Sequence, residues 1–148
     1  MSSQMVATAY QQRAKGPFNL VVSGEAETWL PSLRQIVGPE YLTTYPVDSD
    51  RQLLQVVQSG VADAAVLDEA ARWSMDVIHL LRMIRRVNAV LPVVVVTSRS
   101  DRRLLQEALR LTAFSVVTRP LALEELLRQI HRMMIHLDQM LRQGDVEP

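Results

Sequence analysis

The run of residues 92–97, Pro-Val-Val-Val-Val-Thr, constrains the fold of this chain more than any other segment. A strand with one face in water alternates apolar and polar residues, and this run shows no such alternation. A strand of this composition belongs in the middle of a sheet that is covered on both faces. We therefore expect a layered protein in which this strand is central.

The same kind of unit repeats along the chain from Phe18: a short apolar run, a turn, and apolar residues at helical spacing. The repeats predict strands at 18–22, 41–45, 63–67, 92–97 and 115–118. The run 41–45 is shorter and more polar than the others, as is typical of a strand at the edge of a sheet. Five such units in sequence predict a parallel, doubly wound α/β sheet with right-handed crossovers and helices on both faces.

Start and stop signals bound the expected helices. The first has Thr28 as its N-cap and Pro31 in its first turn, and Gly38-Pro39 ends it. The second begins at a capping box, Ser49 with Gln52, and ends at Gly60. A second capping box, Ser98 with Asp101, leads the fourth helix within residues 98–111. The third helix runs from about 76 to 88, with an apolar stripe made of Val77, Leu80, Leu81, Ile84 and Val87.

Composition excludes several classes of function. Acidic and basic residues balance at 16 each, so no net charge draws the chain to nucleic acid or to an anionic membrane. No apolar run approaches the roughly 20 residues that span a bilayer, and the N-terminus lacks a signal-peptide core. There is no cysteine, which excludes disulfides, thiolate metal sites and thiol nucleophiles. We expect a cytoplasmic domain.

Four segments should meet at the carboxyl edge of this sheet, where doubly wound proteins place their functional crevice. These segments are Ser23-Gly24-Glu25, Asp68, Thr97-Ser98 and Arg119-Pro120. Asp68 is the key position, because it ends an apolar strand and would deliver a carboxylate to the edge.

Over residues 17–132 the chain resembles the receiver domain of bacterial response regulators. The resemblance rests on Val-Val-Ser-Gly-Glu after the first strand, Ala-Ala-Val-Leu-Asp at the end of the third, Leu-Pro-Val-Val-Val-Val-Thr-Ser, and the run 115–127 beginning Ser-Val-Val-Thr-Arg-Pro. It implies a flavodoxin-like fold with strand order 2-1-3-4-5. It divides the chain into a flexible leader (1–16), the receiver-like domain (17–132), and an extension of the last helix with a tail (133–148).

In that family, an acidic pair after the first strand and the aspartate of the third strand hold Mg²⁺. The aspartate accepts a phosphoryl group, and a hydroxyl and a lysine bind the phosphoryl oxygens. Transfer to a carboxylate brings two anions together, so a divalent cation and fixed donors must neutralise the charge. Carried across by position, Asp68 is the phosphoacceptor, Thr97 is the hydroxyl and Arg119 replaces the lysine.

This chain departs from the family at several positions that matter for that chemistry. The acidic pair falls on Ser23 and Gly24, neither of which is a carboxylate. Val116 stands where many receivers have a mobile aromatic ring, and the loop 69–75 lacks the usual Pro-Gly turn. Glu25 or Glu69 would have to complete a Mg²⁺ site with Asp68. The alternative is that Asp68 forms a permanent ion pair with Arg119 and needs no phosphate.

Three further features carry open alternatives. Arg99, Arg102 and Arg103 at the start of the fourth helix could receive an anionic ligand or an acidic partner, or could form a solvated helix face; Arg82, Arg85 and Arg86 pose the same choice. Trp73 either caps the crevice, contacts a partner, or packs on the third helix. The histidines show no spacing typical of metal ligands.

The last helix, expected from Ala122 to Arg142, is about 30 Å long at 1.5 Å per residue. Its apolar stripe continues past the length that one domain needs for its core. It predicts a dimerisation seam, unless this end folds back on its own domain. The residues expected in the seam are Met133, Met134, Leu137, Met140 and Leu141.

Together these features predict a signalling module that works mainly through protein–protein contact. The partner is another protein or a second copy, bound through the fourth-to-fifth-helix face or the C-terminal helix. Phosphoacceptance is expected to be weak or absent, with no resident cofactor and no enzymatic activity beyond autophosphorylation at Asp68. The alternative function is a working phosphoacceptor, phosphorylated by a histidine kinase or a small phosphodonor. Few residues follow the last helix, so we expect no output domain in this chain.

Overall fold

Five parallel strands form one sheet in the computed structural model, which describes residues 18–23, 28–71, 73–98, 101–118 and 123–146, the last six without their side chains. The strand order is β2-β1-β3-β4-β5, as predicted, and the polar strand β2 lies at an edge. The strands are β1 (Phe18–Ser23), β2 (Leu42–Val47), β3 (Ala64–Asp68), β4 (Val93–Thr97) and β5 (Ser115–Thr118).

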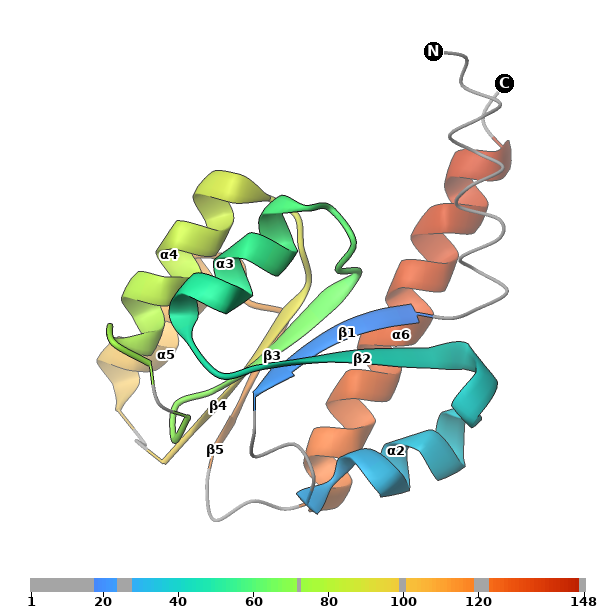
Figure 1. Cartoon of the computed structure of the whole chain (residues 1–148), viewed down its shortest axis with the longest axis horizontal. Coiled ribbons are helices and arrows are strands. Elements are labelled where there is room, and N and C mark those ends of the chain that lie inside the picture. Colours follow the sequence, from blue (N-terminus) through green and yellow to red (C-terminus); the bar gives the residue numbers. More distant parts are fainter. Residues whose placement is uncertain (1–17, 24–27, 72, 99–100, 119–122, 147–148) are drawn as a thin grey trace.

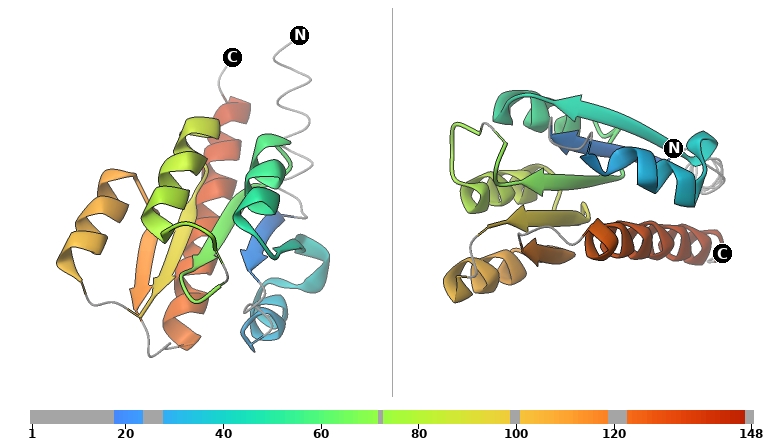
Figure 2. Two further views of the ribbon diagram at one scale, coloured as in Figure 1. Left: turned by 60° about the vertical axis from the view of Figure 1, so that its left-hand side comes forward. Right: turned by 90° about the horizontal axis from the view of Figure 1, so that it is seen from below.

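Helices cover both faces of the sheet (Figure 1). Helices α3, α4 and α5 lie on one face, and α2 and α6 lie on the other (Figure 2). The helices are α2 (Leu30–Val37), α3 (Asp50–Gln58), α4 (Val77–Val87), α5 (Arg102–Arg110) and α6 (Leu123–Val146), with a short 3₁₀ turn, η2 (Pro39–Tyr41), after α2.

Strand β4 contributes side chains to the hydrophobic cores on both faces of the sheet. All five of its residues are buried, as the unbroken apolar run predicts. Val94 and Val96 join the core on the α2–α6 face, and Val93 and Val95 join the core on the α3–α5 face. Successive side chains of a strand point to opposite faces, so this one strand contributes to both cores.

Side-chain caps explain the starts of α3 and α5, and three predicted details of the helices are wrong. Ser49 caps α3 by accepting the Gln52 N–H at 3.1 Å. The N-cap of α2 is Trp29, not Thr28, and no side-chain hydrogen bond caps it. Helix α5 is capped by Asp101, not Ser98, because its carboxylate accepts the Arg103 N–H at 2.9 Å. Val87, predicted in the apolar stripe of α4, is 44% exposed because it lies in the last turn.

In the described part of the chain, no helix combines the length and the apolarity that crossing a membrane requires. The predicted domain bounds stay a prediction, but Met133 and Met134 lie in the buried core on the α2–α6 face. The packed part of α6 therefore continues past residue 132.

Candidate functional site

The carboxyl edge of the sheet brings together three of the four predicted segments. Asp68 ends β3 and pairs in register with Val96, so Thr97 ends β4 one residue further on. On the other side of β3, Val22 pairs with Val66, which places Ser23 level with Leu67. The side chains of Ser23, Asp68 and Thr97 are all buried, at 3%, 4% and 1% exposure.

The loop after β3 turns tightly around Asp68. The Ala70 N–H donates to the Asp68 carboxylate at 2.9 Å. The Ala71 N–H and the indole N–H of Trp73 both donate to the Asp68 carbonyl oxygen, at 3.0 and 2.8 Å. Trp73 is half-buried and packs against the core on the α3–α5 face. Its ring therefore packs on its own domain, next to the backbone of the proposed phosphoacceptor.

Thr97 makes a side-chain contact that the sequence did not predict. Its hydroxyl donates to the Glu69 carboxylate, with 2.8 Å between Oγ1 and Oε1. The Glu69 N–H in turn donates to the Val96 carbonyl oxygen at 2.8 Å. The sequence suggests Glu69 only as a Mg²⁺ ligand, and its position one residue after Asp68 is the only signal for this contact.

The crevice is predicted to include further residues. Glu25 and Arg119 lie outside the described residues, and so does the predicted Asp68–Arg119 ion pair. Among the residues that are described, no three His, Asp or Glu side chains are grouped as a metal site requires. Val116 is half-buried and packs against the core on the α3–α5 face.

A second carboxylate–hydroxyl pair lies beside this loop. Asp50 begins α3 and is 8% exposed. Its carboxylate accepts a hydrogen bond from the Ser74 hydroxyl. That bond, with further backbone N–H donors, lowers the pKa of Asp50 below its ordinary value of 3.8 against the opposing effect of burial. The pair joins α3 to the loop that carries Trp73, and its members lie 24 positions apart in the sequence, which gives no signal of the contact.

Some arginines of the two clusters are exposed to solvent, and others bond to neighbouring elements of the protein. Arg102 and Arg103 are exposed at the start of α5, and Arg99 lies outside the described residues. Arg82 pairs with Glu107 across α4 and α5 at 3.6 Å, beside a hollow of about 560 Å³. The hollow is lined by Asp76, Ile78, His79, Arg82, Asp101, Arg103, Leu104 and Glu107, a mixture of both signs of charge that favours no simple anion.

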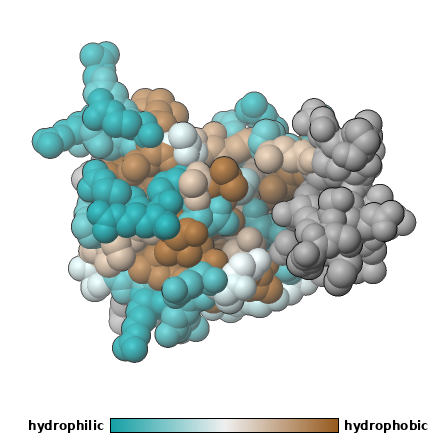
Figure 3. Space-filling view, turned by 90° about the horizontal axis from the view of Figure 1, so that it is seen from above, coloured by the Kyte–Doolittle hydropathy of each residue, from teal (hydrophilic) through white to brown (hydrophobic). Residues whose placement is uncertain are grey.

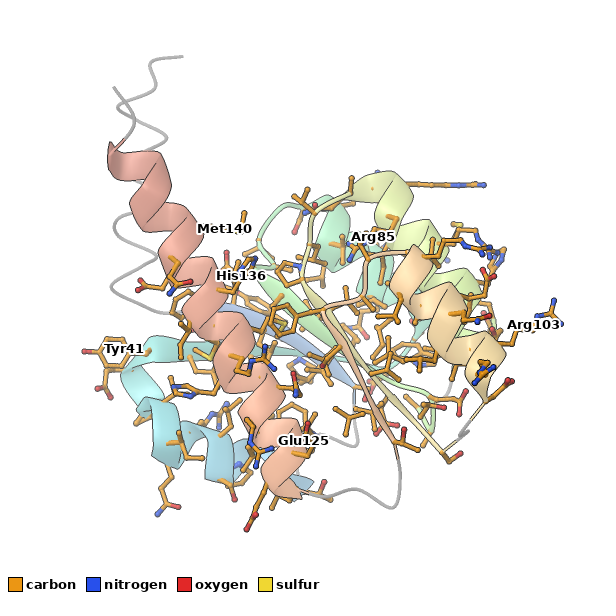
Figure 4. All side chains as sticks on the ribbon, turned by 180° about the vertical axis from the view of Figure 1, so that it is seen from behind. Tyr41, Arg85, Arg103, Glu125, His136 and Met140 are labelled. Atoms are coloured by element: carbon orange, nitrogen blue, oxygen red, sulfur yellow. The ribbon has the colours of Figure 1, made fainter. Side chains whose placement is uncertain are left out.

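Arg85 has a different role from its neighbours. Its guanidinium donates to the carbonyl oxygens of Leu111 at 2.7 Å, Thr112 at 3.1 Å and Asn88 at 3.2 Å. Burial lowers the pKa of the Arg85 guanidinium below its ordinary value. The side chain thus ties α4 to the loop before β5, and sequence spacing alone had not separated it from the solvated arginines (Figure 4).

Helix α6 divides the predicted seam residues into two groups. Met133 and Met134 are 0% and 6% exposed, and Leu137 packs partly against the same core. Met140 is 49% exposed on the outer turns of the helix (Figure 4). The side chain of Leu141 lies outside the described set. Met133 and Met134 are therefore unavailable to a partner while the domain is folded.

The fold and the crevice define a doubly wound α/β protein with a buried strand-end aspartate. The family model of the response regulator receiver domain matches residues 24–131. The chain belongs to this family, the receiver domains of two-component signalling systems.

Solved structures agree with this fold. A CheY-like receiver domain protein from Methanospirillum hungatei JF-1 superposes with a TM-score of 0.69 at 15% identity, covering 84% of this chain and 99% of that one. The signal receiver domain of an HD domain-containing protein from Pseudomonas fluorescens Pf-5 gives 0.67 at 20% identity, covering 84% and 91%. These identities show the fold alone. No curated protein gives a significant match.

Proposed function

We propose that this chain is a receiver-type signalling module that acts mainly through protein–protein contact, with weak or absent phosphoacceptance at Asp68. The observation that carries the proposal is Ser23. It is buried at 3% exposure beside β3, in the place of a carboxylate that would hold Mg²⁺ with Asp68. A neutral hydroxyl supplies one weak oxygen ligand and no charge, whereas Mg²⁺ prefers carboxylates.

Exposed apolar side chains on α5 and α6 support the contact part of the proposal. On α5, Leu105 and Leu109 are 44% and 55% exposed and lie one helical turn apart. On α6, Ile135 and Met140 are 44% and 49% exposed. The coloured part of the face seen in Figure 3 instead mixes hydrophobic and hydrophilic residues. Self-association through the face between α5 and α6, or through α6 itself, is the partner arrangement we propose.

The alternative function is a working phosphoacceptor that receives its phosphoryl group from a histidine kinase or a small phosphodonor. Two observations favour it: Asp68 ends β3 as a receiver aspartate does, and the Ala70 N–H already points at its carboxylate. Mg²⁺ would then depend on Asp68 with Glu25 or Glu69.

Trp73 fluorescence separates the two functions, because its indole donates to the Asp68 carbonyl oxygen. The experiment uses the full chain with Trp29→Phe, since Trp29 is buried in the core on the other face and would add a constant signal. Titration with Mg²⁺ and beryllium fluoride should leave the emission unchanged at low-millimolar Mg²⁺. A saturable response that Asp68→Asn abolishes would establish the phosphoacceptor instead.

Light scattering tests self-association. Shortening the chain near residue 131 would remove buried Met133 and Met134, so substitutions are the sharper tool. Ile135→Glu with Met140→Glu tests α6, and Leu105→Glu with Leu109→Glu tests α5. We expect one pair to reduce the mass to that of a monomer. Val90→Glu is the control, since Val90 is 77% exposed outside both surfaces. A monomeric mass for the unmodified chain would contradict the proposal that the chain self-associates.

A further inference from the structure

The contact between Thr97 and Glu69 follows from the register of the sheet. Asp68 pairs with Val96, so the next residues, Glu69 and Thr97, are directly opposite each other. The bond from the Glu69 N–H to the Val96 carbonyl oxygen, 2.8 Å, continues the ladder past the end of β3. Side chains opposite each other on neighbouring strands are close enough to interact. The backbone therefore directs Glu69 to the hydroxyl.

In this contact a negatively charged carboxylate oxygen accepts the hydrogen bond of a hydroxyl group, as a phosphoryl oxygen would. A threonine hydroxyl has one hydrogen, and Thr97 gives it to the Glu69 carboxylate at 2.8 Å. A hydrogen bond to an ionised acceptor is stronger than one between neutral groups. Thr97 is 1% exposed, so little water competes for this hydrogen.

We propose that Glu69 is a built-in competitor for the Thr97 hydroxyl, holding the donor that an incoming phosphoryl oxygen at Asp68 would need. This inference rests on the proposed function, and it gives weak phosphoacceptance a second cause besides the neutral Ser23. A phosphoryl group at Asp68 would have to displace the carboxylate from Thr97 and then stay beside its negative charge. Thr97 is thus engaged by an anion with no modification of Asp68.

Nuclear magnetic resonance of the Thr97 methyl group tests the contact itself, through couplings that report the side-chain rotamer. In the unmodified chain we expect one rotamer. In Glu69→Ala the acceptor is gone, and the couplings should change to those of an averaged side chain. Glu69→Gln keeps an acceptor oxygen of the same reach without the charge and should keep the rotamer. An unchanged rotamer in Glu69→Ala overturns the proposal.

Beryllium fluoride with Mg²⁺ then tests competition, read at the same methyl group. Removing Glu69 should lower the half-saturating concentration at least about tenfold, the effect of one charge-assisted hydrogen bond. Glu69→Gln should lower it less, since its amide oxygen still holds the hydroxyl. Adding Asp68→Asn to Glu69→Ala should abolish the gain.

The outcomes separate this inference from the proposed function. Equal half-saturation in the unmodified chain and Glu69→Ala, or no response in either, overturns the competitor role. Equal tightening in Glu69→Gln and Glu69→Ala also overturns it, because repulsion alone would then explain the effect. Tight binding by the unmodified chain counts against the proposed function, whereas the difference between the two proteins decides the role of Glu69.

Discussion

The two edges of the sheet use polar side chains in different ways. At the amino edge they bond to backbone: Arg85 donates to three carbonyl oxygens, and Asn19 donates its side-chain N–H to the Val61 carbonyl oxygen at 3.0 Å. At the carboxyl edge two carboxylates accept from hydroxyls of other side chains, Glu69 from Thr97 and Asp50 from Ser74.

The difference teaches which substitutions this fold tolerates. Most of the carbonyl oxygens bound at the amino edge are partly shielded from water, so the bonds to them stabilise the fold directly. Two side chains that bond to each other can be substituted together, and one of them can instead bond to a ligand that displaces the other. We expect the amino edge to govern stability and the carboxyl edge to govern binding.

The largest effect should come from Arg85→Ala at the amino edge. Losing the guanidinium leaves three carbonyl oxygens without this donor, and we expect the free energy of unfolding to fall by about 3 kcal/mol in chemical denaturation. Arg85→Lys should recover only part of this loss, because one ammonium cannot match the planar fork. Arg86→Ala is the matched control: Arg86 is exposed, and its loss should cost less than about 0.5 kcal/mol. Equal losses for Arg85 and Arg86 would break the comparison.

The next effect lies on the β1 side of the carboxyl edge. Ser23→Asp with Gly24→Asp would restore the acidic pair that the receiver family has after its first strand, and we expect the affinity for Mg²⁺ to rise at least about tenfold in calorimetry. The same change in an Asp68→Asn background is the control and should bind more weakly. No gain in affinity would mean that charge at this edge does not limit metal binding.

The smallest effect concerns Asp50 and Ser74. The pKa of Asp50 is lowered, chiefly by the Ser74 hydroxyl, so its ionised form stabilises the folded chain at pH values above 3.8. Asp50→Asn should cost about 1 kcal/mol at pH 7, and this difference should disappear as the pH falls below 3.8 through the lower folded-state pKa. Denaturation of both proteins across this range measures it. Ser74→Ala should reproduce the effect, and a pH-independent difference would contradict it.

Most of the fold could be predicted because its signals are local. The unbroken run of β4, the glycine after α2 and the Ser49 cap each depend on a few adjacent residues. The error at Ser98 arises because a second capping residue, Asp101, lies within one turn of it, whereas α2 begins at Trp29 without any side-chain cap. Choosing between them depends on the path of the chain before the helix.

The site was predictable in position and not in its contacts. Asp68 and Thr97 were found because each ends an apolar strand. The Thr97–Glu69 bond depends on the register between β3 and β4, and the Asp50–Ser74 bond joins residues 24 apart. The spacing of residues in the sequence reveals neither the register between two strands nor a contact between distant residues. Arg85 was indistinguishable from Arg82 and Arg86 because two of the three carbonyl groups it binds, those of Leu111 and Thr112, lie in another part of the chain.

Helix α6 is one continuous rod from the domain core to Met140 and beyond. Each residue of an α-helix turns by about 100° and advances about 1.5 Å. The packed turns therefore fix the angular position of Met140 about the helix axis. Inserting one residue after Leu137 would rotate the Met140 side chain by about 100° around the helix axis without disturbing the core. Inserting seven residues would bring it back close to its original orientation.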